Sequence, residues 1–121
     1  MQLERLARIG AAATIQEVPG TGWVVRVCEV PLPQGWSKPQ TGIAFVAPQG
    51  YPFAKPDCFW TDPDLRLANG NMPQNAQLAN PIPGVPDSLL WFSWHVQLWN
   101  PNRDDFVTWF ALIKQRLAQP K

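Results

Sequence analysis

The chain has 121 residues, of which 45% are hydrophobic and only 16% are charged. A chain of this length suits one domain with one core, spanning residues 1–121, and its composition excludes a disordered tail or a polar linker. Ten basic and nine acidic residues give a formal net charge of +1 without any basic run, so neither nucleic acid nor an anionic membrane is an expected partner.

The first half of the chain shows a helical pattern followed by strand-like patterns. Apolar residues at helical spacing over residues 3–11 predict a short N-terminal amphipathic helix. Residues 14–18 and 23–30 are rich in β-branched side chains and flank a Pro-Gly-Thr-Gly turn, which predicts a hairpin. Residues 42–47 and 57–61 continue the strand-like pattern. We therefore expect a four-stranded antiparallel meander.

Prolines interrupt the chain between the third and the fourth predicted strand. Four of them fall within residues 47–63, and each fixes a backbone angle and removes a hydrogen-bond donor. The segment is therefore neither one continuous central strand nor a helix. In the rigid turn that results, Tyr51 and Phe53 flank Pro52.

The last part of the chain begins with an irregular segment and ends with a helix. Residues 63–87 have little periodicity, which predicts a long loop of a kind that is usually functional or mobile. The densely apolar residues 89–99 are expected to tuck back under the sheet. Asn102 is predicted to cap the final helix, with Asp104 and Asp105 in its first turn. The apolar stripe of that helix consists of Phe106, Trp109, Phe110, Ile113 and Leu117.

The chain has two cysteines, Cys28 and Cys58, and a single histidine. The cysteines are too far apart for a Cys-x-x-Cys motif, and one histidine does not complete a zinc site with them. Both cysteines lie in apolar, strand-like runs, where a buried and unreactive thiol is expected. We therefore predict neither a metal site nor a cofactor.

The sequence shows no membrane-spanning or targeting segment. No apolar run approaches the roughly 20 residues that cross a bilayer. Charged residues interrupt the apolar positions of residues 1–10, unlike the core of a signal peptide. The expected location is the cytoplasm.

The order of these elements, with two short motifs, resembles the ubiquitin-conjugating E2 enzymes. Gly50-Tyr51-Pro52-Phe53-Ala54-Lys55-Pro56 is similar to their Tyr-Pro-Phe-x-x-Pro signature, and Trp99-Asn100-Pro101 is similar to the Trp-Ser-Pro before the helix that follows their active site. The chain is most similar to the bacterial proteins classed as prokaryotic E2 family E, which occur near ubiquitin-like proteins, E1-like enzymes and isopeptidase-like proteins.

This resemblance implies an α+β domain of the UBC-like (E2) fold. Such a domain would have an N-terminal helix, a four-stranded antiparallel meander, a long irregular loop and a C-terminal helix packed on the sheet. The resemblance also implies two partners, a ubiquitin-like protein and an E1-like enzyme.

The family further implies a nucleophilic cysteine in the loop before Trp-x-Pro, because a thiolate attacks the E1 thioester and is itself a good leaving group. Here that loop, Thr61 to Leu98, contains no cysteine. Cys58 stands at a strand position that the family fills with an apolar residue, so neither cysteine is carried over as the nucleophile. Near the place of the family's His-Pro-Asn stands Asp62-Pro63-Asp64, whose acidic pair would repel an oxyanion.

Ser93 and His95 are the candidate catalytic residues. Ser93 falls close to the position of the family's cysteine when counted back from Trp99, and His95 follows two residues later. A histidine on the same face of a strand can activate a serine, which would give an oxyester intermediate. In the more ordinary interpretation, Ser93 is a hydrogen-bonded polar residue and His95 bonds a backbone carbonyl, since the sequence identifies no acid to orient the imidazole.

Four aromatic residues and the proline between two of them are the candidates for partner binding, because aromatic anchors are enriched at interface hot spots. The candidates are Tyr51, Pro52, Phe53, Trp94 and Trp99. Trp23, Trp60 and Trp109 are expected in the core instead.

Three functions are compatible with these residues. The first is a non-catalytic module that binds a ubiquitin-like protein or an E1-like partner in a bacterial ubiquitin-like modification pathway. The second is a conjugating enzyme with a non-cysteine nucleophile, for which Ser93 and His95 are the candidates. The third is a structural or assembly subunit in which only the fold is kept.

Overall fold

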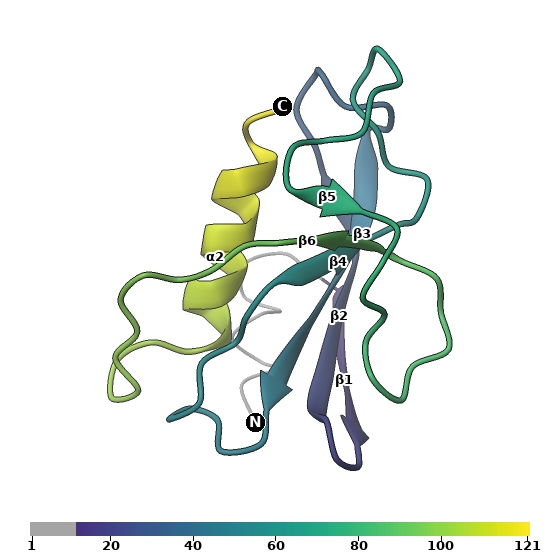
Figure 1. Cartoon of the computed structure of the whole chain (residues 1–121). Coiled ribbons are helices and arrows are strands. Elements are labelled where there is room, and N and C mark those ends of the chain that lie inside the picture. The colour runs from purple at the N-terminus through teal and green to yellow at the C-terminus, as the bar shows by residue number, and fades with distance from the viewer. Residues whose placement is uncertain (1–11) are drawn as a thin grey trace.

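The computed structural model describes residues 12–121 of the chain (Figure 1). The predicted helix over residues 3–11 lies outside the described residues. Within them, six strands form one antiparallel sheet in the order β1-β2-β3-β4-β6-β5. The strands are β1 (Ala12–Val18), β2 (Gly22–Pro31), β3 (Gln40–Pro48), β4 (Phe59–Thr61), β5 (Ala76–Gln77) and β6 (Leu90–Phe92).

The predicted hairpin and the meander from β1 to β4 are confirmed, but a sheet of only four strands is wrong. β6 pairs with β4 and places Phe59 opposite Phe92, and β5 adds to the far side of β6. Residues 90–92 therefore lie in the plane of the sheet rather than under it. Strands of two or three residues are too short to show an alternating pattern, which is why the sequence did not indicate them.

The two faces of the sheet are covered by different parts of the chain. Adjacent strand residues point to opposite faces, so Val25 packs in the cluster that contains the helix residues, whereas Val24 packs with Ile82 and Val85. The segment 78–87 is thus held against the face opposite the helix (Figure 1). Its backbone is fixed there by the Trp60 indole, whose Nε1 donates to the Asn80 carbonyl at 2.9 Å.

The C-terminal helix α2 (Phe106–Leu117) covers the other face of the sheet (Figure 1). All five residues of its predicted apolar stripe are buried, as expected from their spacing. Of the tryptophans predicted in the core, Trp60 and Trp109 are buried and Trp23 is half-buried. No helix within residues 12–121 is both long enough and apolar enough to cross a membrane.

The predicted cap of this helix is wrong by three residues. Asp105, rather than Asn102, is the N-cap: its carboxylate accepts from the backbone N–H groups of Val107 and Thr108. The Thr108 hydroxyl in turn accepts from the Asp105 N–H, which completes a capping box. Asn102 instead lies in the preceding turn, where its N–H donates to the Asn100 side chain.

Candidate functional site

A polar cluster lies where the chain leaves β6 and enters β4. Ser93 and His95 follow β6, and Asp57 and Cys58 precede β4. The backbone of this part is tied on both sides: the Cys58 N–H donates to the Trp94 carbonyl at 2.8 Å, and the Ser93 N–H donates to Asn75 at 2.8 Å. These bonds continue the pairing of β6 with both of its neighbours, so the side chains of the cluster project from a fixed backbone.

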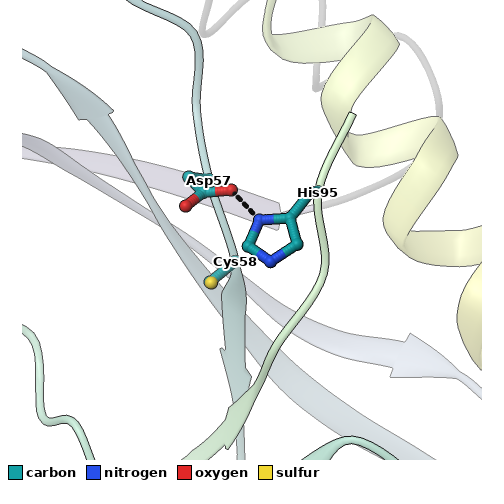
Figure 2. Close-up of side chains that lie close together, drawn as sticks. All are labelled: Asp57, Cys58 and His95. Atoms are coloured by element: carbon teal, nitrogen blue, oxygen red, sulfur yellow. Dashed lines mark hydrogen bonds and ion pairs between the residues drawn. The ribbon is translucent and has the colours of Figure 1, made fainter. Parts of the chain in front are cut away.

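His95 is the centre of the cluster. Its Nδ1 lies 2.5 Å from Asp57 Oδ1 (Figure 2). An ionised carboxylate can only accept, so the shared proton belongs to Nδ1, and in the neutral ring Nε2 is left as an acceptor. Nε2 lies 3.5 Å from Ser93 Oγ, a long contact of the kind that tightens when a substrate binds.

Asp57 is the residue that sequence reasoning missed. It is 38 positions away from His95, and only the pairing of β4 with β6 brings the two side chains together. The carboxylate of Asp57, the imidazole of His95 and the hydroxyl of Ser93 follow one another in a row. The order of these three groups resembles that of a serine-histidine-aspartate triad, which is recognised by geometry rather than by sequence position.

The two cysteines have opposite environments. Cys58 is buried, as predicted, and its burial raises the pKa of the thiol. Cys28 is exposed, so the prediction that it is buried is wrong. β2 has a register irregularity between Val27 and Val30, and a bulge of this kind turns a side chain out of the alternating pattern. A buried thiol with a raised pKa holds little thiolate at neutral pH and is a poor nucleophile.

The partner-binding candidates divide into structural and exposed residues. Tyr51 stacks on Phe106 with ring centroids 4.6 Å apart, and Trp99 donates through Nε1 to the Pro52 carbonyl. Trp94 is half-buried beside the guanidinium of helix α2. Phe53, by contrast, is 80% exposed.

A further exposed residue lies in the same region. Leu98 is 84% exposed, and it lies next to Trp99, whose indole bonds the Tyr-Pro-Phe turn. Lys55 of that turn also reaches the neighbouring segment, donating through Nζ to the Val96 carbonyl. Phe53 and Leu98 thus project from two segments that are hydrogen-bonded together. Leu98 could not be predicted as exposed from the sequence, because a single leucine in an apolar run is usually buried.

One lysine bridges the two carboxylates of the Asp62-Pro63-Asp64 segment and offsets part of their charge. Lys38 Nζ donates to Asp62 at 2.7 Å and to Asp64 at 3.0 Å. The bond to Asp62 is the main cause that raises the pKa of Lys38, and the bond to Lys38 lowers the pKa of Asp64. The two carboxylates are therefore engaged with a cation, which weakens the repulsion of an oxyanion that the sequence suggests.

Three side chains of the cluster also offer different donor atoms. Asp57, Cys58 and His95 supply a carboxylate oxygen, a sulfur and a ring nitrogen that all lie within 4.8 Å of one another. Figure 2 shows the three side chains converging from the two segments. The expectation of no metal site rested on cysteines and histidines alone. It left out this set, because the third member of the set is a carboxylate.

The fold and this region define an E2-like α+β protein. Its helix and antiparallel sheet fit a UBC-like fold, and the Tyr-Pro-Phe turn is hydrogen-bonded to the Trp-x-Pro segment. The profile of the family described as prokaryotic E2 family E matches residues 11–120, and the chain belongs to this family. No curated protein and no solved structure matches the chain.

Proposed function

We propose that the protein is an E2-like enzyme of a bacterial ubiquitin-like modification pathway that carries its acyl group as an oxyester on Ser93. The observation that carries the proposal is the chain of contacts from Asp57 through His95 to Ser93. Membership of an E2-like family supplies the reaction class, and the Thr61–Leu98 loop without a cysteine supplies the need for another nucleophile.

The transfer step uses each member of the triad once. Ser93 Oγ attacks the carbonyl carbon of the thioester that an E1-like partner presents, and its proton passes to His95 Nε2. The new O–C bond forms as the C–S bond breaks, and His95 returns the proton to the departing sulfur. Asp57 holds the Nδ1 proton, so it fixes the ring orientation and stabilises the imidazolium that forms in between.

A serine has to be activated in a way that a cysteine does not. Its hydroxyl is a weak nucleophile at neutral pH, whereas a few per cent of a free thiol is already ionised. An adjacent general base therefore matters more for an oxyester carrier than for a thioester carrier. His95 meets this need, because its Nε2 faces the hydroxyl.

The test is an adduct assay with the E1-like partner, ATP and the ubiquitin-like protein. We expect an adduct that survives a thiol reductant, is cleaved by hydroxylamine, and is lost in Ser93→Ala. Ser88→Ala is a matched control, since Ser88 is exposed and outside the triad. An adduct that persists in Ser93→Ala, or that a thiol reductant cleaves, contradicts the proposal.

A non-catalytic binding role is the second candidate, and one observation favours it. Phe53 and Leu98 are exposed at 80% and 84%, and they project from two segments joined by the bond between Trp99 and Pro52. Exposed apolar side chains of this size suit the contact of a protein partner. If binding is the whole function, Phe53→Asp abolishes complex formation with the E1-like or ubiquitin-like partner, and Ser93→Ala changes nothing.

A further inference from the structure

We propose that Asp57, Cys58 and His95 form a binding site for a thiophilic divalent cation, of which Zn²⁺ fits best. The three side chains come from two segments that meet at the start of β4. The site stands on its own geometry and does not depend on the oxyester chemistry. Its effect on that chemistry, described below, does rest on the proposed function.

The donor atoms are close to the spacing that zinc requires. Zinc bonds of about 2.3 Å to sulfur and about 2.0 to 2.2 Å to nitrogen or oxygen place tetrahedral donors about 3.3 to 3.6 Å apart. Here the oxygen, sulfur and nitrogen atoms all lie within 4.8 Å of one another. Small side-chain rotations about a fixed backbone therefore bring the three donors to a common centre.

The backbone at Cys58 explains how neighbouring residues face the same centre. In a regular strand, adjacent side chains point to opposite faces. Cys58 has a φ of +60°, a left-handed conformation that is uncommon for a residue other than glycine. The chain is held in it by the bond from the Cys58 N–H to Trp94. This turn interrupts the alternation just before β4, so Asp57 and Cys58 both approach His95 (Figure 2).

The donor types select the metal. A thiolate and an imidazole suit zinc and its neighbours, whereas Mg²⁺ and Ca²⁺ prefer oxygen ligands alone. Three protein donors leave one tetrahedral position open, as in zinc sites that also bind water or a substrate.

Binding must displace protons from the site. Burial keeps the Cys58 thiol protonated at neutral pH by raising its pKa, and a coordinating thiol is deprotonated outright. The cation also replaces the proton shared between Asp57 and His95 if it takes Nδ1. Lys55, which lines the same pocket as Asp57 and bonds the Val96 carbonyl through Nζ, is a cation whose charge acts against metal binding.

A bound cation has a direct consequence for the triad. An imidazole that gives its lone pair to a metal cannot accept the Ser93 proton, because Nε2 either holds the cation or, with the cation on Nδ1, already carries the ring proton. Zinc at this site should therefore inhibit acyl transfer to Ser93.

Cobalt(II) is the probe for the site, because thiolate coordination to Co²⁺ gives a charge-transfer absorption that can be titrated. The experiment uses tag-free protein in a reduced buffer, with Zn²⁺ added afterwards to displace the cobalt. We expect the band in the unmodified protein and in Cys28→Ser, which removes the other thiol. Cys58→Ser abolishes the band, and His95→Gln weakens cobalt binding by about tenfold or more.

The outcomes separate this proposal from the proposed function. Ser93→Ala should bind cobalt normally while it loses the acyl adduct, and the adduct assay is run with a chelator so that zinc plays no part in it. His95→Gln changes an exposed residue and so keeps the test valid if Cys58→Ser does not fold. Absence of the band in the unmodified protein, or a band that Cys58→Ser keeps and Cys28→Ser loses, overturns the metal site.

Discussion

The short segment from Phe92 to His95 separates two regions with different charged groups. A buried guanidinium lies on one side of the segment, and an exposed acid and imidazole lie on the other. On one side, Phe92 and Trp94 pack against the guanidinium of Arg116. On the other side, Ser93 and His95 form the polar cluster with Asp57. The alternation of a strand-like backbone places the two pairs on opposite sides.

The region around Arg116 is buried and structural. Arg116 is 3% exposed, and its guanidinium donates to the backbone carbonyls of Gln74, Gln119 and Lys121. Burial lowers the pKa of the guanidinium, but an arginine still stays protonated.

The Asp57 region is the reverse, with the side chains of both Asp57 and His95 more than half exposed. A buried charge with three hydrogen bonds to backbone carbonyls fixes the C-terminal part of the chain. An exposed polar cluster, by contrast, remains open to a partner or a substrate. This difference is the reason for placing the proposed chemistry on the Asp57 side of the segment.

The largest effect should be on adduct formation and should come from Asp57→Asn. This substitution changes the polar cluster and leaves the Arg116 region untouched. An amide can donate to Nδ1, which moves the ring proton to Nε2 and leaves no acceptor for Ser93. We expect adduct formation in a single turnover to slow by about a hundredfold or more. The thermal midpoint should change little, because the side chain is about half exposed.

Asp87→Asn is the matched control for that variant. Asp87 is also exposed and also pairs with a cation, Arg26, at 3.4 Å, but it lies outside the triad. Equal rates of adduct formation in the two variants would show that Asp57 does not orient His95. The proposed catalytic role of the Asp57 side would then be wrong.

The second effect is on stability and comes from Arg116→Ala. Removing the guanidinium leaves three carbonyls without their donor and uncovers the rings of Trp36, Phe92 and Trp94. We expect the free energy of unfolding to fall by about 3 kcal/mol, measured by urea denaturation. Arg116→Lys keeps the charge but loses the planar fork, so it should recover only part of the loss. Full recovery would mean that charge alone matters there.

The sequence predicted those elements of the fold whose hydrophobic pattern extends over several periods. The strands β1 to β3 and the stripe of α2 each span several periods, so alternation and helical spacing identified them. The helix cap was not readable, because three acidic or amide residues compete for it. The turn decided it: the N–H groups of Arg103 and Asp104 both donate to the Asn100 carbonyl, which delays the helix.

Only part of the candidate site could be predicted from the sequence, for a similar reason. Ser93 and His95 are two residues apart, so local geometry suggested their contact. Asp57 joins them only through the pairing of β4 with β6, whose three residues each carry too little pattern to predict a partner. The φ of +60° at Cys58, which brings a second side chain to His95, has no sequence signal at a residue other than glycine or asparagine.

A third prediction compares the two thiols, because Cys58 lies beside the polar cluster and Cys28 does not. Cys28 is exposed, whereas Cys58 is buried with a raised pKa. In the folded protein without metal, an alkylating reagent should label Cys28 at least about tenfold faster than Cys58, as followed by mass spectrometry of the two peptides. Faster labelling of Cys58 would mean that His95 activates it, and the assignment of the nucleophile to Ser93 would need revision.

The smallest effect should come from the more exposed counterpart of Arg116, the ion pairs of the partly exposed Lys38 with Asp62 and Asp64. The pKa of Lys38 is raised above its ordinary 10.5, so its contribution is complete below that pH and is lost as the pH rises through the raised value. The pKa of Asp64 is lowered below its ordinary 3.8, so its contribution is complete above that pH and is lost as the pH falls through the lowered value. Between these limits the pairs add a constant, salt-screened term.

Lys38→Met tests this term against the buried arginine. We expect the thermal midpoint at neutral pH to fall by no more than about 2 °C, since exposed pairs contribute little, and the difference to shrink at high salt. As the pH falls below 3.8 through the lowered pKa of Asp64, or rises above 10.5 through the raised pKa of Lys38, the variant and the unmodified protein should converge. A loss as large as that of Arg116→Ala would mean that exposure does not distinguish the two charges, because a solvated pair would then stabilise the fold as much as a buried guanidinium does.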